Sequence, residues 1–121
     1  MTIAVWAGVA VLGGLGAILR FLADGRIAAV TGRAFPFGTL VINLVGSFVL
    51  GALVGGAVEG SAYVLAGTAT LGSFTTFSTW MYESHRLVED GELSGAGLNL
   101  GLSLGLGIGG AALGRVIGAH L

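Results

Sequence analysis

The chain has 121 residues, of which 55% are hydrophobic and 9% are charged, and it contains 24 glycines, one proline and no cysteine. Soluble domains average about 25% charged residues, so this composition indicates a membrane protein. The net charge of −1 and the lack of lysine give no support for nucleic-acid binding, and the absence of cysteine excludes disulfides, iron–sulfur clusters and Cys-ligated zinc.

Four apolar segments predict an all-α membrane protein, a single domain over residues 1–121 with four transmembrane helices. Each segment is near or above the roughly 20 residues that a spanning helix needs. The first lacks a basic region before it and is too long for the hydrophobic region of a signal peptide, so we expect it to be retained. The predicted helices cover residues 3–22, 37–58, 62–82 and 94–117.

The second segment carries polar and small residues on one face, at Thr39, Asn43, Gly46 and Ser47. Asn43 lies far enough inside the segment to need hydrogen-bond partners. An asparagine at that depth joins helices about as often as it binds a ligand. The fourth segment repeats the pattern and leaves the same two interpretations open, at Asn99, Ser103 and Gly107.

The third segment contains a hydroxyl-rich run, Gly72–Trp80, where a spanning helix is normally most hydrophobic. The preceding residues 62–71 cover about 15 Å as a helix, half of a hydrocarbon core of about 30 Å. The run therefore starts near the bilayer midplane, where irregular backbone is tolerated only inside protein or beside a water-filled path. We expect a helix broken around Gly72–Thr75, with free carbonyls that suit a hard cation and free N–H groups that suit an anion.

Two aromatic side chains follow the expected break. Phe77 and Trp80 are three residues apart and share a helix face, while Ser78 and Thr79 turn toward adjacent faces. Aromatic rings present positively polarised edges, so such a pair can contact a small anion while excluding water. Core packing, with the hydroxyl groups bonded back to the helix, is the alternative interpretation.

Glycines recur at four-residue spacing and let helices approach closely in lipid. Three rows have this spacing: Gly51 and Gly55; Gly97, Gly101, Gly105 and Gly109; and Gly110, Gly114 and Gly118. Four helices of this length enclose little space, so we expect a permeation path to need a second copy of the chain. Residues 105–110 also match the dinucleotide fingerprint G-x-G-x-x-G, which we reject because no strand precedes them.

Charged residues lie at the ends of the four segments rather than deep within them. Four arginines fall on one side and Arg115 on the side of both termini, which by the positive-inside rule favours termini outside. Proton-coupled pumps normally need a carboxylate within the membrane, so a passive, neutral-lined path for an anion fits the chain better. The four arginines are Arg20, Arg26, Arg33 and Arg86.

Several motifs together resemble a family of small fluoride channels called Fluc or CrcB, over nearly the whole chain. The motifs are Gly13–Ala17 with Arg20, Gly38–Leu40 with Asn43 and Gly46, Gly72–Trp80, and Asn99 with Ser103. The resemblance implies a channel in a prokaryotic plasma membrane, not an enzyme, that exports fluoride passively. It also implies an antiparallel, dual-topology dimer with two fluoride pores.

The resemblance further implies roles for single residues. Arg20 would lie near the aqueous entrance, and the carbonyls of Gly72 and Thr75 from both subunits would hold a structural sodium ion. Within the fluoride route Asn43 would donate a hydrogen bond, and the serine and threonine hydroxyls would form a track. The side chains implied to line that route are Asn43, Phe77, Ser78, Thr79, Trp80 and Ser103.

Two departures from the family pattern leave alternatives open. The family usually has a second phenylalanine at the position of Trp80, and the uneven arginine distribution leaves a homodimer or a heterodimer with a paralogous subunit. Two other functions compete with the channel. A small-multidrug-type exporter is weakened by the lack of a carboxylate in the first segment, and a non-transporting assembly subunit is supported only by the glycine faces.

Overall fold

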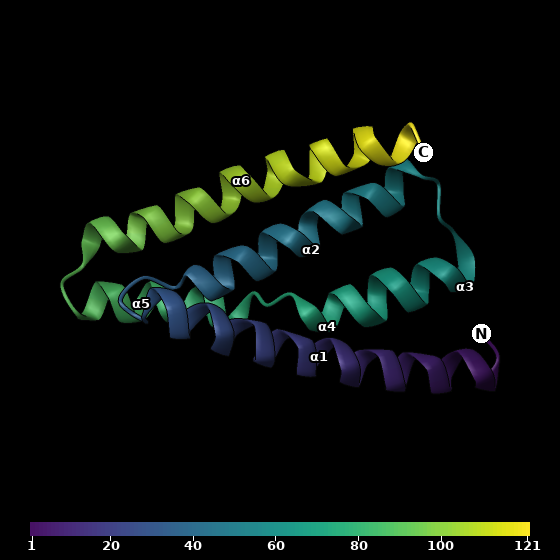
Figure 1. The fold of residues 1–121 in the computed structure, drawn as a ribbon, viewed down its shortest axis with the longest axis horizontal. Coiled ribbons are helices and arrows are strands. Elements are labelled where there is room, and N and C mark those ends of the chain that lie inside the picture. The colour runs from purple at the N-terminus through teal and green to yellow at the C-terminus, as the bar shows by residue number, and fades with distance from the viewer.

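The computed structural model describes all 121 residues, and the chain passes four times along the long axis of the molecule (Figure 1). Both termini lie at one end, together with the connection between the second and third passages. The other two connections lie at the opposite end. Three passages are single long helices: α1 (Ile3–Thr31), α2 (Phe37–Gly55) and α6 (Leu93–Ala119).

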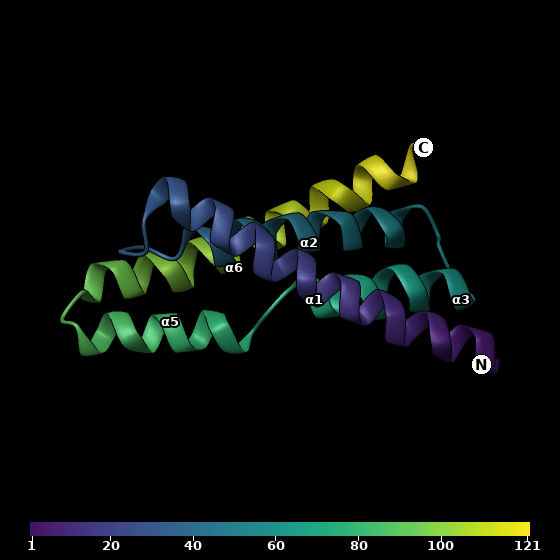
Figure 2. The same ribbon diagram turned by 60° about the horizontal axis from the view of Figure 1, so that its bottom comes forward.

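The third passage is interrupted. Its first half consists of α3 (Gly60–Tyr63), the π-helix η1 (Val64–Leu71) and the short α4 (Gly72–Phe74), and its second half is α5 (Ser78–Glu89). Figure 2 shows the stretched segment that precedes α5. The predicted all-helical architecture, with four passages and a broken third helix, is therefore confirmed.

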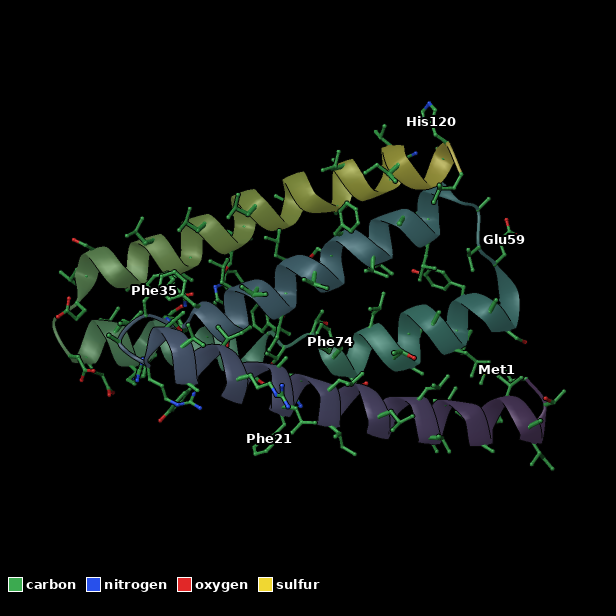
Figure 3. All side chains as sticks on the ribbon, in the orientation of Figure 1. Met1, Phe21, Phe35, Glu59, Phe74 and His120 are labelled. Atoms are coloured by element: carbon green, nitrogen blue, oxygen red, sulfur yellow. The ribbon has the colours of Figure 1, made fainter.

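The three long helices are each long and apolar enough to cross a membrane. Large apolar side chains cover their outer surfaces. Phe21 on α1, for example, is 78% exposed and points away from the other helices (Figure 3). Apolar side chains on the outside of a helical bundle are those expected to contact lipid, so the protein is a multi-pass membrane protein.

The predicted helix ends differ from the observed ones, most of all for α1, which ends at Thr31 rather than at residue 22. No proline or glycine pair interrupts residues 23–31, and the helix stops only at Gly32, which has a φ of 76°. Arg26 consequently lies on a helix and not in a loop. At its C-terminus α2 ends earlier than predicted, at Gly55, while α5 continues to Glu89.

Glycines bring the backbones of α2 and α6 into direct contact. A Cβ atom at Gly55 would overlap a carbonyl oxygen of α6, and one at Gly114 would overlap the carbonyl oxygen of Phe48. Gly51 and Gly118 lie in equally close contacts. These two rows therefore pack as predicted from their spacing.

The remaining glycine row has no neighbour within the chain. A Cβ atom at any of its members would meet no atom within 4 Å. The reason is geometric, because successive helical residues are turned by about 100° and the adjacent row already faces α2. The prediction that this row brings helices together is not met within one chain. Its members are Gly97, Gly101, Gly105 and Gly109.

We expect Gly114→Ala to destabilise the protein by about 1–3 kcal/mol, because the added methyl group would overlap the Phe48 backbone. Thermal unfolding in detergent measures the effect. Gly109→Ala in the same helix is the matched control, and it should be neutral or slightly stabilising because alanine is the better helix former. Equal unfolding temperatures for the two variants would contradict the close contact.

The first two helices also approach the third passage at its interruption. Gly16 of α1 is buried, and a Cβ atom there would overlap the Ser73 hydroxyl and the Thr70 carbonyl oxygen. On α2, a Cβ atom at Gly46 would overlap the methyl group of Thr75. Ser73 and Thr75 are thus covered in part by neighbouring helices.

Candidate functional site

The interruption of the third passage comprises residues 75–77, slightly later than the predicted Gly72–Thr75. Thr75 has extended backbone angles (φ −82°, ψ 162°), which end α4. The N–H groups of Thr76 and Thr79 bond to side-chain oxygens of Asn43 and Thr76 instead of to the preceding turn. As a result, the carbonyl oxygens of Gly72 and Thr75 accept no hydrogen bond within the chain.

Asn43 holds the interrupted segment by two hydrogen bonds. Its Nδ2 donates to the Thr76 carbonyl oxygen at 2.8 Å, and its Oδ1 accepts from the Thr76 N–H at 2.8 Å. One side chain therefore satisfies both backbone groups that the broken helix leaves open at Thr76. The amide keeps a second Nδ2 proton with no acceptor in the chain, because an asparagine carries two such donors.

A groove of about 480 Å³ opens beside the interruption, between α2, the third passage and α6. Backbone, amide, hydroxyl and aromatic groups meet in it. It is lined by six of the nine residues predicted to have roles: Asn43, Gly72, Thr75, Phe77, Trp80 and Ser103. Ser103 lines the groove, and its buried hydroxyl has no hydrogen-bond partner within the chain.

Three predicted residues lie outside this groove. Ser78 is exposed on the first turn of α5. Thr79 lines a second hollow of about 270 Å³ beside the connection between α1 and α2. Arg20, expected at the pore entrance, lines neither hollow, and its buried Nε has no hydrogen-bond partner. The Thr76 hydroxyl, which lines the groove, is hydrogen-bonded to both hydroxyls, since Thr76 Oγ1 donates to Thr79 Oγ1 at 3.1 Å and lies 3.4 Å from Ser78 Oγ.

The aromatic pair is arranged edge to face. The ring centroids of Phe77 and Trp80 are 5.7 Å apart with an interplanar angle of 79°. Phe77 is 70% exposed, whereas Trp80 is partly covered by α6. In such a pair the C–H edge of one ring meets the face of the other, and the remaining ring edges, which are positively polarised, can attract a small anion.

The second hollow contains charges of both signs. Asp24 bonds Arg33 at 3.3 Å, and Arg86 donates to the Arg33 carbonyl oxygen at 3.1 Å. Thr39 donates to Glu83 at 2.5 Å. Thr79 therefore lines a hollow that contains charged side chains, and it does not line the neutral groove.

Three structural features near the groove were not predicted from the sequence. Thr76 was part of the polar run but had no assigned role, although it is the partner of Asn43 and caps Thr79. The polar face of the second segment includes Thr39, but nothing in the sequence indicated that Thr39 donates a hydrogen bond to Glu83. No sequence signal indicated that Trp80 bonds to Asn99, with an Nε1 to carbonyl-oxygen distance of 3.0 Å.

Comparison with known proteins identifies the family. The sequence model of the family described as CrcB-like protein, Camphor Resistance (CrcB), matches residues 7–115. The chain belongs to the CrcB family. Fluoride-specific ion channel FluC 2 of Mycolicibacterium paratuberculosis is 52% identical over 99 residues, covering 82% of this chain and 81% of the relative.

Other CrcB relatives cover almost all of both chains. Fluoride-specific ion channel FluC 2 of Mycobacterium tuberculosis strain H37Rv is 46% identical over 117 residues, covering 97% of this chain and 93% of the relative. Fluoride-specific ion channel FluC of Syntrophotalea carbinolica is 40% identical, covering 93% of this chain and 96% of the relative. The resemblance to the CrcB family read from the motifs is thus confirmed.

Proposed function

We propose that this CrcB protein is a fluoride-specific ion channel that lets fluoride leave the cytoplasm passively. The names of relatives that match nearly the full chain support this function. The observation that carries it structurally is the groove beside the interrupted helix. It combines an amide, a free hydroxyl and aromatic edges, and no carboxylate lines it. Neutral donors of this kind suit a permeating anion and leave no proton carrier for coupled transport.

Passive export follows from the chemistry of fluoride. Fluoride enters acidified cells as a neutral weak acid and ionises inside. The membrane potential then drives the anion outward with about 2.3 kcal/mol per charge per 100 mV. The channel needs no reaction and no energy coupling, so it is not an enzyme.

Within the groove, each group would make a weak contact with the anion. The second Nδ2 proton of Asn43 and the Ser103 hydroxyl would donate hydrogen bonds. Phe77 would offer its ring edge. Several weak sites in series allow fluoride to lose water without being held, which conduction requires.

The route needs a second subunit. Phe77 is 70% exposed, and the groove beside it is open. An antiparallel partner would cover both and supply the other wall of each pore. Relatives that carry the number 2 in their names, such as FluC 2, support a paralogous partner as an alternative to a second identical chain.

A sodium ion fits the backbone of the interruption. The carbonyl oxygens of Gly72 and Thr75 accept no hydrogen bond, and both residues line the groove. Neutral carbonyl oxygens are ligands for hard cations, and two subunits would supply four of them. When bound, the ion would add positive potential near the anion route and would not itself be transported.

Fluoride efflux from liposomes tests the proposed function. Purified protein in vesicles loaded with fluoride should release it without a proton gradient, as measured with a fluoride electrode. Chloride-loaded vesicles are the control and should retain their contents. Proton-coupled movement of an organic cation would instead support a small-multidrug-type exporter, and no flux of either kind would support an assembly subunit.

We expect Phe77→Ile to lower fluoride flux about tenfold or more, because isoleucine fills space but has no polarised ring edge. Fluoride efflux from liposomes measures the change. The matched control is Phe21→Ile, the same substitution at an exposed position outside the groove, and it should change flux less than about twofold. Equal losses in both variants would remove the aromatic contact from the route.

A further inference from the structure

A buried cluster of hydrogen bonds joins α5 to α6 behind the groove. It consists of Trp80, Ser84 and Asn99, and we refer to it as the Trp80 cluster. Asn99 is 0% exposed and Ser84 is 5% exposed. Asn99 Nδ2 donates to Ser84 Oγ at 2.8 Å and, at 3.5 Å, to the Trp80 carbonyl oxygen. Ser84 Oγ donates to the same carbonyl oxygen at 2.8 Å.

The cluster determines where the indole N–H of Trp80 points. Trp80 Nε1 donates to the backbone carbonyl oxygen of Asn99 at 3.0 Å. Asn99 does not line the groove, although Trp80 does. The N–H therefore faces α6, and the groove is left with carbon-bound hydrogens of the ring. The Trp80 ring stands at 79° to the ring of Phe77, with 5.7 Å between the two centroids.

We propose that Asn99 is a positioning residue that withholds the Trp80 N–H from the permeating anion. This inference rests on the proposed fluoride route. An indole N–H is a strong donor, and in a dry site it would bind fluoride much more tightly than a ring edge does. Tight binding slows conduction, because an ion must leave each site as well as enter it. With its N–H occupied, Trp80 serves the route as a plain aromatic edge.

The Asn99 side chain acts on the ring indirectly. The amide fixes the distance between α5 and α6 by bonding Ser84 and the Trp80 backbone. That distance brings the Asn99 carbonyl oxygen within reach of the indole. Replacing Asn99 by leucine removes the amide and introduces an apolar side chain of similar size. Ser84 keeps its bond to the Trp80 carbonyl oxygen.

Hydrogen exchange of the indole N–H tests the cluster without measuring conduction. The chain has two tryptophans, so Trp6→Phe leaves Trp80 as the only indole signal in a ¹H–¹⁵N spectrum. We expect slow exchange in this background and exchange at least about tenfold faster after Asn99→Leu. Ser84→Ala removes the hydroxyl on α5 that accepts from Asn99 Nδ2, so this variant should also speed the exchange of the indole N–H. Unchanged exchange in both variants would overturn the proposal.

Fluoride efflux then distinguishes positioning from general packing. Asn99→Leu should lower flux about tenfold when Trp80 is present. Trp80→Phe has no N–H to withhold, so it should still conduct, and adding Asn99→Leu should cause little further loss. An equal loss in both backgrounds, no loss in either, or a Trp80→Phe protein without conduction would overturn the proposal. Absence of fluoride flux in the parent protein would instead refute the proposed function, and the exchange result would still decide whether the cluster holds the indole.

Discussion

Asn43→Asp should abolish fluoride flux while the protein still folds. The carboxylate would lose the Nδ2 donor and place an oxygen opposite the Thr76 carbonyl oxygen, which the amide now binds at 2.8 Å. It would also put a negative charge into a groove that fluoride must enter. Two like charges about 4 Å apart repel by about 4 kcal/mol at the effective dielectric constant of a protein surface. A loss of flux of about a thousandfold is therefore expected.

Liposome efflux measures the loss, and gel filtration in detergent shows whether the variant still assembles. Ser94→Asp controls for an added carboxylate, because Ser94 is exposed on the first turn of α6, where an acidic side chain is favourable. Flux in this control should remain near that of the parent. If Asn43→Asp also conducts at the parent rate, Asn43 serves only to pack and hold the third passage.

Features that depend on local chemistry were predictable from the sequence. The hydroxyl-rich run halfway along the third apolar segment indicated a broken helix, and the structure has its interruption within that run. Asn43 was expected to need partners because of its depth, and it has them at Thr76. The glycine spacing predicted close helix packing, and two of the three rows have it, between α2 and α6. In each case one residue type has few physically acceptable environments inside a membrane.

Features that depend on three-dimensional pairing were not predictable. The choice of Thr76 as the partner of Asn43, and of Asn99 as the acceptor for Trp80, depends on the rotation of one helix against another. A shift of one residue turns a helical side chain by about 100°, so small errors in register change every partner. The π-helical turns of η1 shift the register in this way and have no clear sequence signal.

The length of α1 was mispredicted for a different reason. Hydropathy marks where the apolar stretch ends, at residue 22, but a helix can continue beyond the membrane as a polar helix. Here it continues to Thr31, where Gly32 provides the positive φ that ends it. The ion pair of Asp24 and Arg33 then closes the turn that leads to α2.

Removal of sodium should silence the channel. The carbonyl oxygens of Gly72 and Thr75 accept no hydrogen bond. Each buried acceptor left unpaired costs about 1–3 kcal/mol, and an antiparallel dimer would bring four of them together. A sodium ion bound there would satisfy all four, so its loss should collapse the interruption that Asn43 holds open.

The experiment replaces sodium on both sides of the membrane with a large organic cation such as N-methyl-D-glucamine, with time allowed for release of bound ion. Fluoride efflux should fall at least about a hundredfold and return when sodium is restored, because several unpaired carbonyl groups together exceed the 2.7 kcal/mol or so that such a factor represents. The unfolding temperature should fall in the same medium, since a ligand that binds only the folded protein stabilises it. Full conduction without sodium, with an unchanged unfolding temperature, would show that the Gly72 and Thr75 carbonyls serve neither as a sodium site nor as a support for the pore.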